Sequence, residues 1–83
     1  MNIYIGNLDF KVDENDLRGL FEEYGSVKDS KIIVDQFNGR SKGFGFVVME
    51  DESEAKNAIS ELHGSSLEDR TIVVNEAKPR KKF

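Results

Sequence analysis

The sequence predicts an α+β domain in which two helices cover one face of a four-stranded antiparallel sheet. Four segments alternate apolar and polar residues as strands do, and two segments repeat apolar residues at the i, i+3, i+4, i+7 spacing of helices. Their order along the 83 residues is strand, helix, strand, strand, helix, strand. Because each element has one apolar face, this arrangement buries all of those faces in a single core.

The first strand is expected at residues 2–8, where two isoleucines share one face and Tyr4 lies on the other. A helix should begin after Asp13, a favourable N-cap residue, with Asp16 in its first turn. We expect Gly25 to end this helix as a C-cap glycine. The apolar stripe consists of Leu17, Leu20, Phe21 and Tyr24.

The second strand, residues 27–34, alternates imperfectly. Val27 and Ser30 both suit the core side only if a β-bulge lies between them. The pair Asn38-Gly39 is a strong turn signal, and it separates this strand from a third strand at residues 42–50. We therefore predict that the second and third strands are antiparallel neighbours.

A second helix should follow Asp51, which repeats the capping pattern with Glu54. Its apolar stripe consists of Ala55, Ala58, Ile59 and Leu62. His63 is the only histidine, and no second ligand lies near it in sequence, so we expect neither a metal site nor a catalytic role. A polar connection leads to a fourth strand at residues 71–77, and Pro79 stops that strand from continuing.

The third strand contains the unusual run Lys42-Gly43-Phe44-Gly45-Phe46-Val47-Val48-Met49. Alternation places Phe44 and Phe46 on the face opposite Val47 and Met49, which belong in the core. Right-handed crossovers place the first and third strands side by side at the centre of the sheet, so Tyr4 joins the phenylalanines on the uncovered face. Exposed aromatic rings beside a cation suit stacking on nucleic-acid bases next to a phosphate.

This run resembles the aromatic strand of the RNA recognition motif, K/R-G-F/Y-G/A-F-V-x-F/Y, at seven of eight positions, Met49 being the departure. Residues 3–8 are similar to the six-residue motif of that family's first strand, with Tyr4 at the aromatic position. Residues 35–42 are similar to its D-x-x-T-G-R-S-R/K loop. The resemblance implies a ferredoxin-like βαββαβ fold, with the motif at residues 1–78 and a basic tail at 79–83, as in small stand-alone members of the family.

By this resemblance, Tyr4 and Phe44 should each stack on a base, Phe46 should pack against the sugars between them, and Lys42 should reach a phosphate. The other residues expected to contact RNA are Asn2, Lys31, Arg40, Asn75, Ala77 and Lys78. The expected partner is single-stranded RNA, because duplex bases cannot be splayed onto a sheet, and single-stranded DNA stays open as an alternative. Phe37, in the central loop, is either an added stacking group or a residue that folds back over the edge of the core.

The net charge of −4 is unusual for a nucleic-acid-binding protein. However, many acidic residues fall in the two helices, whereas cations fall in strands, the central loop and the tail, so we expect an acidic back and a more basic front. With no cysteine, no apolar run of about 20 residues and a strand pattern from the first residues, we expect a cytoplasmic protein without a targeting segment, membrane span or cofactor. We expect a monomer, with weak self-association through the aromatic face as a further possibility.

Three other classes of protein fit the sequence less well. A cold-shock domain also carries a K-G-F-G-F strand, but near the N-terminus of a nearly all-β chain, whereas here the motif follows an amphipathic helix. A protein-interaction module of the same family typically has an altered or covered aromatic platform, whereas the aromatic residues of the platform are all present in this sequence. A ferredoxin-like enzyme such as an acylphosphatase needs an arginine in its first loop, and residues 7–11 contain none, so we predict that the protein is not an enzyme.

Overall fold

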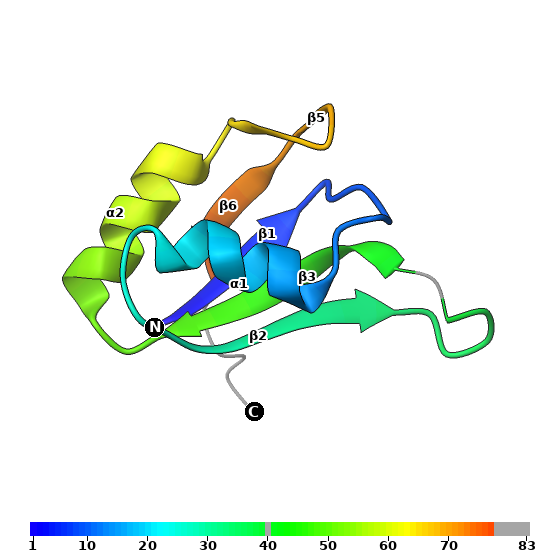
Figure 1. Ribbon diagram of the computed structural model, residues 1–83, viewed down its shortest axis with the longest axis horizontal. Helices are drawn as coiled ribbons and strands as arrows, with labels where there is room; N and C mark the ends of the chain where they lie inside the picture. The colour runs from blue at the N-terminus through cyan, green and yellow to red at the C-terminus, as the bar shows by residue number, and fades with distance from the viewer. Residues whose placement is uncertain (40, 78–83) are drawn as a thin grey trace, which may run out of the picture.

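The computed structural model describes residues 1–39 and 41–77, and it confirms the predicted α+β, ferredoxin-like architecture. A four-stranded antiparallel sheet has the order β2-β3-β1-β6, and both helices lie on one side of it (Figure 1). The uncovered side is called the open face below. The elements are β1 (Asn2–Gly6), α1 (Glu14–Glu22), β2 (Val27–Val34), β3 (Ser41–Met49), α2 (Glu52–Leu62), β4 (Ser66–Leu67), β5 (Arg70–Thr71) and β6 (Val73–Glu76).

The core lies between the sheet and the helices, as the apolar stripes predict. The strands contribute alternate residues such as Ile3, Ile5 and Val47, all fully buried. Leu17 and Phe21 of α1 are also fully buried against them. Because every other strand residue turns toward the core, the residues between them are left on the open face. Neither helix within the described ranges is long and apolar enough to cross a membrane.

Helix α1 begins as predicted but ends differently. Asp13 caps it, accepting a hydrogen bond from the Asp16 N–H at 2.8 Å, and the Asp16 carboxylate accepts from the Asp13 N–H at 3.2 Å. The prediction that Gly25 is the C-cap is wrong, because the helix stops at Glu22 and Glu23 forms the cap in a right-handed conformation. A left-handed glycine is therefore not required at this end.

A glycine is needed at position 25 for a different structural reason. A Cβ atom there would collide with the side chain of Glu54 from α2. The Glu54 carboxylate accepts a hydrogen bond from the Ser26 N–H at 3.3 Å instead of returning to its own cap residue, so only half of the capping pattern predicted at Asp51 forms. The glycine thus permits a close contact between the α1–β2 turn and α2.

The bulge predicted in β2 is present. Val27 pairs with Met49 and Asp29 pairs with Val48, so Lys28 is an extra residue in β2. The extra residue reverses the alternation of the strand. Val27 and Ser30, three residues apart, therefore both turn toward the core. A second shift in register lies next to Gly43, whose φ of 87° is positive.

The connection between α2 and the last strand contains a short hairpin that the sequence did not predict. Strands β4 and β5 pair Ser66 with Thr71 around a two-residue turn in which Glu68 and Asp69 have φ of 50° and 62°. Both values are those of a type I′ turn, which usually contains asparagine and glycine. The predicted strand at residues 71–77 is accordingly divided, and only Val73–Glu76 joins the main sheet.

Two polar side chains attach this hairpin region to the rest of the fold. The Asn7 amide donates to the Thr71 carbonyl at 2.6 Å and accepts from the Arg70 guanidinium at 3.0 Å. His63, the C-cap of α2, accepts at Nδ1 a hydrogen bond from the Val74 N–H at 3.1 Å. This contact gives His63 a structural role in joining α2 to β6.

Candidate nucleic-acid interface

Three aromatic rings form a cluster on the open face. Tyr4 of β1 lies directly opposite Phe46 of β3 in the register, and Phe44 lies two residues away along β3. The ring centroids are 6.0 Å apart for Tyr4 and Phe44, 5.9 Å for Tyr4 and Phe46, and 6.2 Å for Phe44 and Phe46. All three rings are partly exposed, and none belongs to the core cluster.

The orientations of these rings differ in a useful way. The planes of Tyr4 and Phe44 are inclined by only 35°, whereas Phe46 meets them edge-on, at 62° and 90°. Two rings of similar orientation offer neighbouring flat surfaces for stacking. The third ring, Phe46, lies about equally far from both and is edge-on to them, which suits it to contacts with the edge of a ligand.

Glycine residues make room for this cluster and for the strands beneath it. A Cβ atom on Gly6 would lie 2.5 Å from the Tyr4 hydroxyl oxygen and 2.9 Å from its Cε2, so the Tyr4 ring rests on the bare backbone of Gly6. At Gly45, a Cβ would collide with the backbone carbonyl of Lys31. The close approach that glycine permits at Gly45 is therefore made by β2, and not by a ligand.

A hollow of about 270 Å³ lies on the open face beside Phe46. It is lined by Asn2, Asp29, Lys31, Phe46, Val48 and Ala77. The register explains its lining, because Val48 has Asp29 on one side and Asn2 on the other, so an apolar side chain lies between two polar ones. Ala77 closes one end, where its N–H donates to the Asn2 carbonyl at 2.8 Å.

The structure brings together most of the residues predicted to contact RNA. Asn2, Lys31, Phe46 and Ala77 meet at the hollow, while Asn75 lies opposite Tyr4 in the register. Arg40 and Lys78 lie outside the described residues, as does the predicted tail, and for Lys42 the structure describes only its place in β3.

Two residues of the hollow, Asp29 and Val48, are not among the residues that the sequence predicts to contact RNA. Val48 follows Phe44 and Phe46 at the same alternation along β3, and this is the signal that places it on the open face. The position of Asp29 depends on the bulge at Lys28, and the sequence did not reveal which residue the bulge would turn outward.

Two further phenylalanines are exposed in turns outside the sheet. Phe37 is 98% exposed in the β2–β3 loop, where the Asp35 carboxylate accepts from the Phe37 N–H at 2.7 Å and from the Asn38 N–H at 3.2 Å. The alternative in which Phe37 folds back over the core is therefore wrong. Phe10, in the β1–α1 loop, is 69% exposed.

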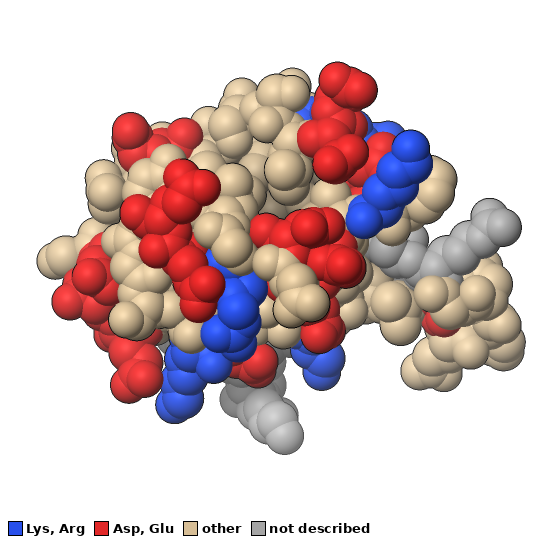
Figure 2. Space-filling model, viewed as in Figure 1, with Lys and Arg blue, Asp and Glu red and all other residues tan. Residues whose placement is uncertain are grey.

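The helix side of the molecule is mainly acidic. Figure 2 shows acidic side chains spread over the helices and few cations among them, as predicted for the back of the domain. Within the described ranges, no group of histidine, cysteine, aspartate and glutamate residues could hold a metal ion. A polyanion would thus be repelled by the helix side and approach the sheet side more easily.

Comparison with known protein families agrees with this geometry. Residues 3–73 match the RNA recognition motif. The chain belongs to the RNA recognition motif family. This assignment confirms the resemblance derived from Tyr4 and the aromatic run of β3, and it confirms at the level of the family the prediction of an RNA-binding domain.

Relatives of this RNA recognition motif occur in cyanobacteria and plants. RbpA of Synechocystis is 48% identical over 96% of this chain and 79% of its own length. The 28 kDa chloroplastic ribonucleoprotein of spinach is 45% identical over 98% of this chain but only 36% of its own length. The chain thus spans about a third of that relative, and a quarter of the 31 kDa ribonucleoprotein of Nicotiana sylvestris.

Solved structures agree with the fold. The crystal structure of the RNA-binding protein PG1 superimposes with a TM-score of 0.93 at 49% identity, covering 99% of both chains. A complex of the Sex-lethal protein with RNA gives a TM-score of 0.90 at 26% identity, covering 98% of this chain and 48% of the other.

Proposed function

We propose that this RNA recognition motif binds single-stranded RNA on the open face of its sheet, with Tyr4 and Phe44 stacking on two bases. The observation that carries the proposal is the aromatic cluster, whose three rings lie outside the core within 5.9–6.2 Å of one another. Partly exposed apolar rings on a sheet are a binding surface rather than a fold requirement. Stacking is worth about 1–3 kcal/mol per base and tolerates any sequence.

The spacing of the rings supports a single strand as the ligand. Stacked bases in a regular strand follow one another at about 3.4 Å. Bases lying on Tyr4 and Phe44 would be side by side, because the ring centroids are 6.0 Å apart and inclined by 35°. Such bases are unstacked from each other and turned toward the protein, which a duplex does not allow.

In this proposal the other open-face residues have secondary roles. Phe46 contacts the sugars between the two stacked bases, and Asn75 reads a base edge beside Tyr4. Lys42, Arg40 and Lys78 contact phosphates. The domain acts as a monomeric binding module without catalysis, in the cytoplasm. Size-exclusion chromatography tests the monomeric state, and cell fractionation tests the location.

An NMR titration with a randomised single-stranded RNA of about eight nucleotides tests the interface. We expect amide shifts at Tyr4, Phe44, Phe46 and Asn75, because base stacking changes ring-current shifts at the sheet. The same titration with DNA of the same length measures the contribution of the 2′-hydroxyl groups. Shifts confined to the basic tail would indicate charge attraction alone, and a sheet unaffected by RNA would favour a protein partner.

A further inference from the structure

Two opposite charges in the hollow have no ion-pair partner among the described residues. Asp29 and Lys31 lie two residues apart on the same face of β2, and both line the hollow. Within residues 1–39 and 41–77, neither takes part in an ion pair, with each other or with another residue. Both side chains are exposed, so each is available to a ligand. Their separation along the strand, about 7 Å, allows one planar ligand to contact both.

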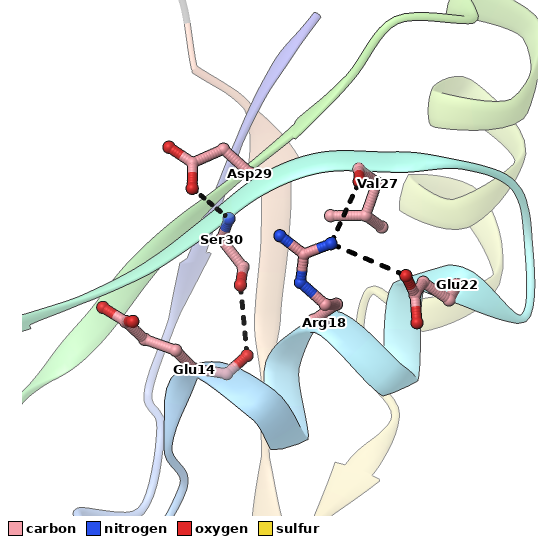
Figure 3. A network of polar contacts seen from close by, with 6 residues as sticks. All are labelled: Glu14, Arg18, Glu22, Val27, Asp29 and Ser30. Atoms are coloured by element: carbon pink, nitrogen blue, oxygen red, sulfur yellow. Dashed lines mark hydrogen bonds and ion pairs between the residues drawn. The ribbon is translucent and has the colours of Figure 1, made fainter.

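The position of Asp29 is fixed by the structure around it. One carboxylate oxygen accepts a hydrogen bond from the Ser30 N–H at 2.9 Å, and Ser30 in turn donates through its hydroxyl to the Glu14 carbonyl of α1 at 3.1 Å (Figure 3). Figure 3 also shows the Asp29 side chain on the opposite side of β2 from α1. The strand is held to α1 a second time by Arg18, which donates to the Val27 carbonyl at 3.2 Å.

The remaining walls of the hollow suit a nucleic-acid base. The Phe46 ring and the Val48 side chain are apolar, and the hollow adjoins the stacking cluster through Phe46. A base that follows those stacked on Tyr4 and Phe44 can therefore enter it without leaving the open face. At about 270 Å³, the hollow has room for one base.

The arrangement of charges distinguishes among the four bases. A carboxylate has two acceptor oxygens and an ammonium group only donors. Guanine offers two adjacent donors, N1–H and the N2 amino group, with the acceptors O6 and N7 beyond them. Adenine and cytosine each place a single amino group beside a ring acceptor, and uracil places one N–H between two carbonyls. Only guanine can satisfy both carboxylate oxygens while presenting its acceptors to a neighbouring ammonium group.

We propose that this hollow is a guanine-selecting subsite, in which Asp29 accepts hydrogen bonds from N1–H and the N2 amino group and Lys31 donates to O6 or N7. The subsite rests on the proposed function, since it extends the RNA path across the open face. Asp29 is thus the residue that sets base preference, whereas the aromatic cluster supplies affinity that does not depend on sequence.

Fluorescence anisotropy with four octanucleotides tests the subsite: oligouridine, and oligouridine with one central guanine, adenine or cytosine. We expect the wild-type domain to bind the guanine-containing RNA about tenfold more tightly than the other three, as one bidentate contact provides. In Asp29→Asn the preference should fall to less than about threefold, because the amide has only one acceptor oxygen. That oxygen can still accept from the Ser30 N–H, so the fold should persist.

Two further variants make the test specific. Asp69→Asn removes the same charge in the turn between β4 and β5, away from the hollow, and should keep the guanine preference. Val48→Leu fills the hollow without changing charge and should remove the guanine preference. This variant keeps the subsite testable if Asp29→Asn fails to fold. A ¹⁵N spectrum of each variant reports whether it is folded.

The outcomes separate this inference from the proposed function. If the wild type binds none of the four RNAs, the proposed function fails. If it binds all four equally, RNA binding stands and the guanine subsite is refuted. Asp29→Asn binding all four more tightly by the same factor would mean that Asp29 acts only by repelling phosphate, which also refutes the subsite.

Discussion

The substitution Phe44→Ala separates a binding role for the aromatic cluster from a structural one. Phe44 is partly exposed, lies outside the core and touches two other rings, Tyr4 at 6.0 Å and Phe46 at 6.2 Å between centroids. An aromatic pair contributes about 0.5–1.5 kcal/mol, and solvent-exposed pairs fall at the low end. Losing two such pairs should therefore lower the free energy of unfolding by about 1 kcal/mol.

Phe44→Ala should weaken RNA binding by at least as much free energy as it removes from the stability of the fold. Removing one stacking ring is worth about 1–3 kcal/mol, which corresponds to an increase in Kd of about 5- to 150-fold. Phe44→Tyr keeps the ring and should bind within about threefold of the wild type. Fluorescence anisotropy with an eight-nucleotide RNA measures Kd, and urea denaturation measures the free energy of unfolding.

Phe21→Ala provides the matched control. Phe21 is fully buried in α1, so truncating it should lower the free energy of unfolding by about 3–5 kcal/mol. If Phe44→Ala were as destabilising as Phe21→Ala, Phe44 would be a core residue. If Phe44→Ala left Kd unchanged, stacking on this ring would be refuted whatever its effect on stability.

Three further predictions concern the surroundings of the cluster. Gly6→Ala should raise Kd about tenfold in the same anisotropy assay, because its Cβ would displace the Tyr4 ring, 2.5 Å away at the hydroxyl oxygen; an unchanged Kd would contradict this. Phe37→Ala should change the free energy of unfolding by less than about 0.5 kcal/mol, since the ring is 98% exposed, yet raise Kd severalfold through lost stacking; urea denaturation and anisotropy check both. The logarithm of the binding constant should fall against the logarithm of salt concentration with a slope of about −2 to −3, as three or four phosphate contacts provide, and a slope near −7, equivalent to about ten contacts, would contradict binding by the open face alone.

The fold was predictable because most elements are encoded locally. The helix stripes, the Asp13 cap and the alternation of β1 each depend on residues close together in sequence, and all are present. The central pairing of β1 with β3 follows from general rules of chain crossing. The aromatic cluster could therefore be located from sequence, because alternation and strand order together fix it.

The features that could not be predicted depend on details of turns and register. The hairpin β4–β5 has Glu68 and Asp69 at positions where asparagine and glycine are the usual signal. Gly25 does not mark the end of α1, because what requires a glycine there is the close contact with Glu54. The hollow could not be predicted because one inserted residue, Lys28, decides which face of the sheet Asp29 occupies.

The bulge and the side chains of α1 also affect how the domain behaves toward other copies of itself. Strand β2 is at the edge of the sheet, where free N–H and C=O groups invite pairing with a strand from another molecule. Here the Val27 carbonyl accepts from Arg18, and the Ile32 N–H donates to the Glu14 carboxylate at 3.4 Å. A bulge adds twist to this edge, and Lys28 places a charge on it. An incoming strand would have to displace these contacts, so the edge is protected against the association that leads to aggregates.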